Sequence, residues 1–254
     1  MKVLTIALNT FKEAIRDRIL YLILFISIFF IVFSKVLSMM TVGDELKVIK
    51  DVGLASISLF GVFMAILIGT NLVYKEIDKR TIYTLLSKPI HRYEFLLGKF
   101  LGLNITLLVM IIIMSIVFFG LILLHNSKFE AKFLIAILLI YIELAIITAI
   151  SILFSSFTTP ILSSVFTFSL FLIGHFSKNF KFFIMKTKAP IGKLLIKILY
   201  YILPNLEKFN IKTEVVHNLP IKSDFVIYSL VYGIFYALAI LFLSALIFHK
   251  RDFI

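Results

Sequence analysis

The stretch Phe100–Leu124 reads FLGLNITLLVMIIIMSIVFFGLILL and contains no charged residue. A helix needs about 20 residues to cross the roughly 30 Å of hydrocarbon in a lipid bilayer. This block meets that length and is longer than a core helix of a soluble protein requires. The sequence therefore predicts a transmembrane helix here.

The composition of the whole chain agrees with this prediction. Of the 254 residues, 61% are hydrophobic and 16% are charged, and the mean hydropathy is +1.08. Soluble domains use about 45–50% apolar residues, so we expect a single transmembrane domain over residues 1–254. The chain has no cysteine, which excludes disulfides, thiolate metal sites and cysteine nucleophiles.

Five more apolar blocks lie along the chain. Three of the six blocks, 52–74, 100–124 and 225–248, carry no charged residue. The first block, 19–40, carries Lys35 near its end, and the fifth, 160–176, is short and carries His175. A lysine near a helix end reaches the headgroups with its long side chain. We therefore predict an all-α integral membrane protein with six transmembrane helices: Ile19–Met40, Val52–Tyr74, Phe100–Leu124, Phe133–Phe154, Pro160–Phe176 and Phe225–Phe248.

Two shorter segments show the pattern of helices that lie in the membrane interface. In residues 1–18, apolar side chains recur on one helical face, opposite a charged face. The predicted outer segment 177–224 contains a second such pattern between Ile191 and Ile202, bracketed by Pro190 and Pro204. We expect an interfacial helix at each of these places.

The net charge of +12 comes from short basic segments that flank the apolar blocks. No single basic stripe is present, so membrane topology explains the charge better than nucleic-acid binding does. Basic residues concentrate in cytoplasmic loops. We expect a cell-membrane protein with both termini in the cytoplasm, since this orientation puts every arginine and the segment 75–99 on the cytoplasmic side. The lysines of 177–224 then lie outside, against the rule.

The segment Tyr74–Phe100 reads YKEIDKRTIYTLLSKPIHRYEFLLGKF. It mixes basic residues with an apolar set at helical spacing, and Pro89 ends its first predicted helix at a defined place. Such a segment can fill a groove of a partner protein while its charged rim fixes the register. The alternative is a solvated basic loop that only sets the topology.

Part of this segment resembles the region after the second span of type-two ATP-binding-cassette (ABC) exporter permeases. The resemblance rests on Glu76-Ile77, Arg80-Thr81-Ile82, Leu85–Ile90, Arg92 and Gly98-Lys99. An amphipathic first helix, six spans and a long outer segment before the last span fit the same family. The resemblance implies that 75–99 is a cytoplasmic coupling segment, whose coupling helix sits in a cleft of the ATPase. It further implies that the ATPase-coupling residues are Glu76, Arg80, Thr81, Leu85, Leu86, Pro89 and Arg92, with Glu76 tying the second span to the first helix or to the partner.

The resemblance also implies the partners of the chain. These are a separate ABC ATPase subunit, which binds ATP and Mg, and a second permease copy in a homodimer or a related heterodimer. The chain itself is expected to be a transport subunit and not an enzyme, because Gly98-Lys99 and Gly192-Lys193 lack the first glycine and the Ser or Thr of a P-loop.

A narrower similarity concerns the stretch 203–210, which reads LPNLEKFN. It is similar to permeases associated with the maturation of multicopper enzymes. The chain has no cysteine, and its five histidines are scattered without metal-binding spacing. We therefore infer no copper cargo from the sequence.

Glu143 is the only acidic residue in the middle of an apolar block. A charge at the centre of a membrane helix costs roughly 2.5–3.5 kcal/mol on insertion scales, so this side chain should face protein or water. Its role would be proton coupling or a polar contact to substrate. The alternative is a hydrogen bond to a neighbouring helix, for example to a Ser or Thr.

Small residues recur at four-residue spacing on one face of the second span, at Gly61, Ala65 and Gly69. Gly98 and Gly102 repeat the pattern at the start of the third span. Such faces let two helices approach closely. The first face therefore predicts either part of the translocation pathway between two permease halves or an ordinary helix seam.

Two other functions stay open from the residues alone. A secondary transporter or channel would use an intramembrane ionisable group such as Glu143, together with broken helices near the midplane. A polytopic membrane scaffold needs neither feature. An intramembrane enzyme would need convergent His, Asp or Ser groups within the spans, and the sequence does not supply them.

Overall fold

The structure of the chain is a computed structural model. It describes residues 2–41, 43–78, 91–125, 130–177, 186 and 190–250, with backbone only at 72–78, 92, 190, 195, 249 and 250. Helices and turns make up these described residues, and no strand occurs among them. The helices are α1 (Lys2–Ile15), α2 (Arg18–Ser38), α3 (Glu45–Asp78), α5 (Arg92–Leu124), α6 (Lys132–Ser155), α7 (Pro160–His175), α9 (Pro190–Ile202), η1 (Leu206–Phe209), α10 (Lys212–Val216) and α11 (Ser223–Lys250).

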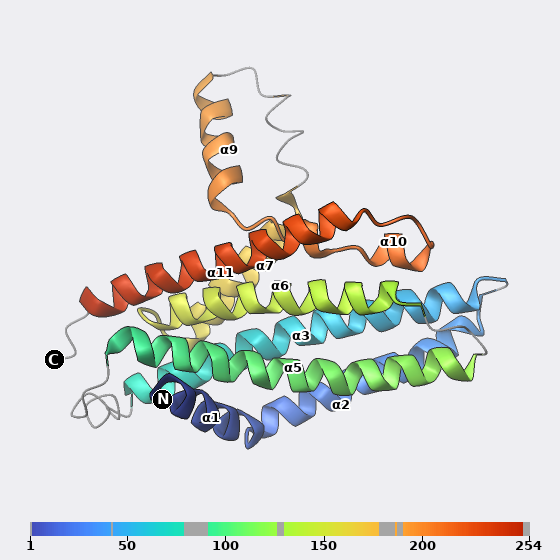
Figure 1. The fold of residues 1–254 in the computed structure, drawn as a ribbon, viewed down its shortest axis with the longest axis horizontal. Coiled ribbons are helices and arrows are strands. Elements are labelled where there is room, and N and C mark those ends of the chain that lie inside the picture. The colour runs from blue at the N-terminus through green and yellow to red at the C-terminus, as the bar shows by residue number, and fades with distance from the viewer. Residues whose placement is uncertain are drawn as a thin grey trace.

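The long helices run side by side along one axis, and α1 lies at the same end of the bundle as the last turns of α11 (Figure 1). Among the described residues, five helices are long and apolar enough to cross a membrane, namely α2, α3, α5, α6 and α11. α7 is apolar but has only 16 residues. At 1.5 Å per residue it measures about 24 Å, less than the roughly 30 Å of hydrocarbon.

The outer faces of the helices expose large apolar side chains. Phe25 on α2 is 72% exposed and Phe235 on α11 is 68% exposed. Exposing such faces to water would be unfavourable, whereas lipid accepts them. Several buried hydroxyls are satisfied within their own helices, as where Thr148 donates a hydrogen bond to the Leu144 carbonyl oxygen at 2.8 Å. The chain is an all-α integral membrane protein, as the sequence predicts.

The predicted apolar blocks coincide closely with helices. α2, α6, α7 and α11 match their blocks to within a few residues, while α3 extends beyond Val52–Tyr74 at both ends and α5 begins before Phe100. The two amphipathic segments also form helices, α1 and α9. Local signals explain the boundaries. Asp17 caps α2 by accepting a hydrogen bond from the Ile19 N–H at 3.0 Å, and Pro160 occupies the first turn of α7.

The chain between α7 and α11 departs from a simple outer segment. After α7 and α9 it returns to the bundle as η1 and α10, and its side chains Leu206, Phe209 and Val215 are buried. η1 packs against α6 and α7, and α10 packs against α3 and α6. We call residues 204–217 the return segment. α7 and the return segment together form one composite column beside α6, so part of the predicted outer segment lies against the bundle.

α9 is the one labelled helix that points away from the bundle in Figure 1. Its apolar face is open, with Ile191 at 74% and Tyr201 at 71% exposed. The helix therefore shows the amphipathic pattern of the sequence without a protein surface covering it among the described residues.

Candidate functional site: the coupling end and the charged interior

The last turn of α3 and the first turns of α5, which flank most of the predicted coupling residues, lie at the end of the bundle that carries α1 (Figure 1). Outside the described residues lie Arg80, Thr81, Leu85, Leu86 and Pro89. Glu76 lies near the end of α3 and Arg92 begins α5, both with backbone only described. The structure therefore describes the two helix ends on either side of residues 79–90, because α3 ends at Asp78 and α5 begins at Arg92.

The start of α5 is fixed by local hydrogen bonding. The backbone N–H of His91 donates to the Glu94 side chain at 2.9 Å. This is the half of a capping box in which the third residue of the helix reaches back to the cap. The imidazole of His91 also stacks on the Tyr93 ring, with centroids 5.4 Å apart. α5 thus begins at a defined residue within the predicted coupling segment 75–99.

α1 packs closely across this first part of α5. A Cβ atom added at Gly98 would lie 2.7 Å from Cβ of Ile6, and one added at Gly102 would collide with the backbone of Ala7. Larger residues at either glycine would push the two helices apart. The second small-residue pattern in the sequence therefore serves the contact between α1 and α5.

An ion pair reinforces the same contact. Lys99 is only 1% exposed, and its Nζ lies 3.5 Å from Oε2 of Glu13 on α1. A buried ammonium group needs such a partner, because its desolvation is unfavourable. α1 and the first turns of α5 are therefore held together by glycine contacts and by this ion pair.

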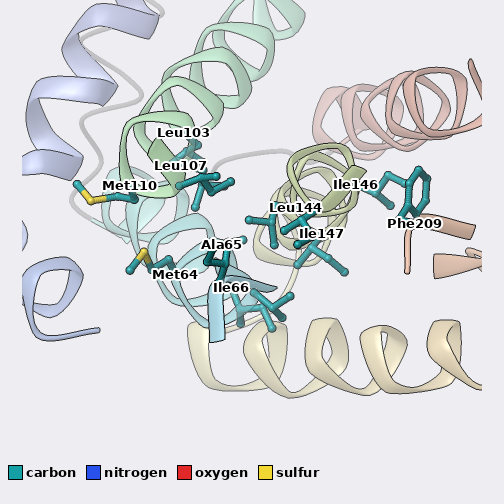
Figure 2. Packing of buried hydrophobic residues seen from close by; sticks show 14 of the residues in the cluster. Met64, Ala65, Ile66, Leu103, Leu107, Met110, Leu144, Ile146, Ile147 and Phe209 are labelled. Atoms are coloured by element: carbon teal, nitrogen blue, oxygen red, sulfur yellow. The ribbon is translucent and has the colours of Figure 1, made fainter. Parts of the chain in front are cut away.

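Gly61, Ala65 and Gly69 lie where α3 faces α6. An added Cβ at Gly61 would lie 2.6 Å from Leu144 Cδ1, and one at Gly69 would collide with the Ser151 side chain. Figure 2 shows Leu144 of α6 pointing toward Ala65 of α3. The predicted small-residue face thus borders a close helix seam within one chain, which we call the α3–α6 seam.

Glu143 lies at the middle of α6 and is 1% exposed. Its Oε1 lies 3.5 Å from Nε2 of His175, the last residue of α7. That oxygen accepts no hydrogen bond from the described residues. The carboxyl group therefore points to the end of α7. At this place α7 stops and the composite column continues with the return segment, and we call it the break in the column.

The return segment brings further charges to this break. Burial lowers the pKa of Lys212, and the nearby carboxylates of Glu143, Asp51 and Glu207 act in the opposite direction. These groups come from four different elements, α10, α6, α3 and η1. We call Asp51, Glu143, His175, Glu207 and Lys212 the interior charge cluster. It brings three carboxyl groups, one lysine and one histidine together in the interior of the bundle.

Polar groups exposed by the break are satisfied mainly by α11. The Tyr232 hydroxyl accepts a hydrogen bond from the Asn205 N–H at 2.9 Å, and the Tyr236 hydroxyl donates to the Ile202 carbonyl oxygen at 2.9 Å. Ser177 donates to the side chain of Asn205 at 2.7 Å. Irregular backbone at membrane depth requires such protein partners, because lipid supplies none.

The opposite end of the bundle carries an open cleft of about 390 Å³. It lies between the start of α3 and α10, and its lining residues are Thr41, Asp44, Lys47, Val48, Asp51, Thr213, Val216 and His217. Asp51 lines this cleft and also belongs to the interior charge cluster. The cluster therefore reaches from the cleft to the middle of the bundle.

Metal binding has no support in this arrangement. The described residues contain no group of three or more His, Cys, Asp or Glu side chains that could hold a metal ion.

Comparison with protein families settles the class of this arrangement. A family model described as ABC-2 family transporter protein matches residues 4–253. The chain belongs to the ABC-2 transporter family. No curated protein matches the chain.

As an ABC-2 family member, the chain is a permease component of an ABC transporter, embedded in the membrane with several spans. Membership implies an ABC ATPase as partner, and it favours a permease over the channel and scaffold alternatives. The family resemblance seen in the sequence is confirmed. The similarity to permeases of multicopper enzyme maturation stays a prediction, as do the individual coupling residues.

Sequence reasoning identified Glu143 in this ABC-2 permease but missed its surroundings. In the sequence, His175 stands only near the end of a short apolar block, and Lys212 is one of the lysines of the predicted outer segment 177–224. One available signal was the pair Gly174 and Gly233, since both lie where the return segment packs closely. A second was the tyrosine spacing on α11, where Tyr232 and Tyr236 fall on one helical face.

Proposed function

We propose that the chain forms half of the translocation pathway of an ABC exporter and is driven by a separate ATPase subunit. The second half is another copy of the chain or a related permease. The ATPase binds ATP and Mg²⁺ and docks on the coupling segment 75–99. Both termini then lie in the cytoplasm, and the protein resides in the cell membrane.

The observation that carries this proposal is the way the coupling segment is attached. It connects α3 directly to α5, two of the longest helices. α5 is joined to α1 by the close contacts at Gly98 and Gly102 and by the ion pair Lys99–Glu13. α3 packs closely against α6 along the α3–α6 seam. A push on the segment therefore displaces four helices together.

The same attachment suggests what is moved. α6 carries Glu143, which faces the composite column of α7 and the return segment. In the proposed transport cycle, ATP-driven closure of the ATPase shifts α3 and α6 relative to that column. Such a shift alters access to the interior between the two permease halves, which is the required step in alternating access.

The direct test is purification of the chain from its native membranes, followed by identification of the proteins that remain bound. The expected result is an ABC ATPase in the complex and ATP hydrolysis in the eluate. The double variant Arg80→Glu/Leu85→Glu should lose the ATPase while keeping the permease in the membrane. A charge reversal removes the complementary rim, and a buried glutamate removes the apolar contact.

A matched control is Lys47→Glu, because Lys47 is exposed at the opposite end of the bundle and its Nζ pairs with the exposed Asp44 at 2.6 Å. This variant should retain the ATPase. Equal loss in both variants would show a general defect, and retention in the double variant would contradict docking at 75–99.

A further inference from the structure

His175 and Glu143 meet at the break in the composite column. Nε2 of the imidazole lies 3.5 Å from Oε1 of the carboxyl group. Glu143 is buried at the middle of α6, whereas the His175 side chain is 23% exposed at the end of α7. One member of the pair is therefore enclosed by protein, and the other is partly open to exchange with its surroundings.

The second ring nitrogen of His175 fixes where the imidazole carries its hydrogen. Nδ1 lies 3.3 Å from the carbonyl oxygen of Phe171, one turn earlier on α7. A carbonyl oxygen only accepts hydrogen bonds, so Nδ1 carries the hydrogen that joins the two atoms. In the neutral imidazole, Nε2 then presents a lone pair to Glu143.

Two acceptors therefore face each other when Glu143 is ionised and His175 is neutral. Oε1 of Glu143 accepts no hydrogen bond from the described residues, so none of them relieves this contact. Burying an ionised carboxylate against a lone pair is unfavourable. A single proton removes the conflict, because either the carboxyl O–H donates to Nε2 or the imidazolium N–H donates to the carboxylate.

We propose that Glu143 and His175 form a proton-binding site, which holds one proton between Oε1 and Nε2. With the proton bound, the end of α7 is tied to α6. When the proton passes to water through the partly exposed imidazole, the carboxylate and the lone pair repel each other and the end of α7 separates from α6. The site itself does not rest on the proposed function, although its use in transport does.

The residue before His175 links this tie to the return segment. A Cβ atom added at Gly174 would lie 2.7 Å from Cγ of Leu206 and 2.9 Å from the Pro204 carbonyl oxygen. Packing this close leaves no free space in which the end of α7 could move alone. Loss of the proton should therefore loosen the return segment together with α7.

Other ionisable side chains stand on the elements that pack against α6. They include Asp51 on α3, Glu207 on η1, Lys212 on α10, and Tyr232 and Tyr236 on α11, with Tyr141 on α6 itself. α5 carries none within residues 100–124. Glu207 and Lys212 act on the Glu143 carboxyl group in opposite directions. Among the described residues, His175 is the ionisable group that contacts this carboxyl directly.

Nitrogen NMR of labelled histidine tests the site. The full chain is reconstituted in lipid bilayers with isotope-labelled histidine, and the His175 signals are those that disappear in His175→Ala. At a pH of about 8, above the ordinary histidine pKa of about 6.5, Nδ1 should carry a hydrogen and Nε2 should still share one. Glu143→Ala should shift the Nε2 signal to that of a free lone pair. A hydrogen on Nε2 alone, or an Nε2 signal that is the same in Glu143→Ala, would overturn the proposal.

Spin labels measure how the tie depends on the proton. The chain has no cysteine, so Leu108→Cys on α5 and Leu172→Cys on α7 supply two unique sites, at side chains 40% and 42% exposed. The distances between the labels give the ratio of separated to tied molecules. If one proton leaves on separation, this ratio should rise about tenfold for each pH unit above about 6.5.

Glu143→Gln distinguishes proton binding from simple packing. The glutamine amide N–H can donate to Nε2 at every pH and so imitates the protonated carboxyl group. This variant should stay tied and lose the pH response. The matched control is Glu45→Gln, which changes an exposed pair whose Oε2 lies 3.1 Å from Nε2 of His125, and it should respond to pH as the unchanged chain does.

Two results with the spin labels would overturn the proposal. One is a ratio that does not change with pH in the otherwise unchanged chain, and the other is a full pH response in Glu143→Gln. Neither measurement requires an ATPase or a cargo, so a failed copurification with an ATPase would leave the proton-binding site standing.

Discussion

The two faces of α6 solve the problem of packing in a membrane in different ways. Against α3, it meets a continuous helix whose glycines allow close approach, at Gly61 and Gly69. Against the composite column, it meets short elements joined by charges and by hydrogen bonds from α11. The first contact depends on shape and has one arrangement. The second depends on polar partners that can be exchanged, so it is where movement is least costly.

The largest effect should come from filling the α3–α6 seam. Gly61→Leu places a side chain where Leu144 already lies, and overpacking of this kind lowers the free energy of unfolding by about 3 kcal/mol. Thermal unfolding of the purified chain in detergent measures the loss. Gly120→Leu is the control, because a Cβ there meets nothing within 4 Å, and its melting temperature should hardly change.

A smaller effect is expected at the charged contact. His175→Ala removes the imidazole whose Nε2 lies 3.5 Å from Oε1 of the buried Glu143, and because the His175 side chain is 23% exposed we expect a loss of about 1–2 kcal/mol. The double variant with Glu143→Gln should cost less than the sum of the two single variants, since the two side chains are direct neighbours. Additive losses in detergent unfolding would mean that the two groups do not interact.

The hydrogen bonds at the break should contribute somewhat less. Tyr232→Phe leaves the Asn205 N–H without its hydroxyl acceptor, a loss of about 1 kcal/mol. Amide hydrogen exchange of residues 203–210 should become faster, while exchange in the α3–α6 seam stays the same. Tyr21→Phe on α2 is a suitable comparison because its side chain is 49% exposed, and it should change neither region.

The smallest loss of stability is expected at the contact between α1 and α5. Glu13 is 40% exposed at its side chain, so Glu13→Gln should lower the free energy of unfolding by about 0.5–1 kcal/mol. Transport in the intact complex should fall more than this loss suggests, because α1 and α5 would no longer move together. Asp44→Asn removes an exposed pair at the other end and should alter neither stability nor transport.

The two faces of α6 also differ in how far the sequence predicts them: the long helices on one side are predictable, and the composite column on the other is not. The five long apolar helices were predictable because the thickness of the bilayer sets a length that each block shows by itself, as Phe100–Leu124 does, whereas the predicted span at 160–176 forms a helix of only 16 residues. α9 was predictable from its helical period. The family followed from the coupling segment, although the contacts of its residues stay predictions.

The return segment could not be predicted in the same way. Its buried residues Leu206, Phe209, Ile211 and Val215 follow neither a helical nor an alternating period, and polar residues separate them. No block of membrane-spanning length therefore forms. The partners of Glu143 come from α7 and α10, so only the folded arrangement brings them together.

Because α7 ends inside the bundle, its helix dipole ends there too. The carbonyl end of a helix carries a partial negative charge of roughly half an elementary charge. At His175 this partial charge lies close to the buried carboxyl group of Glu143, whose Oε1 is 3.5 Å from Nε2 of His175, and away from the screening ions of the solvent. A negative charge on Glu143 would face this helix end, so the end of α7 favours the neutral carboxyl group.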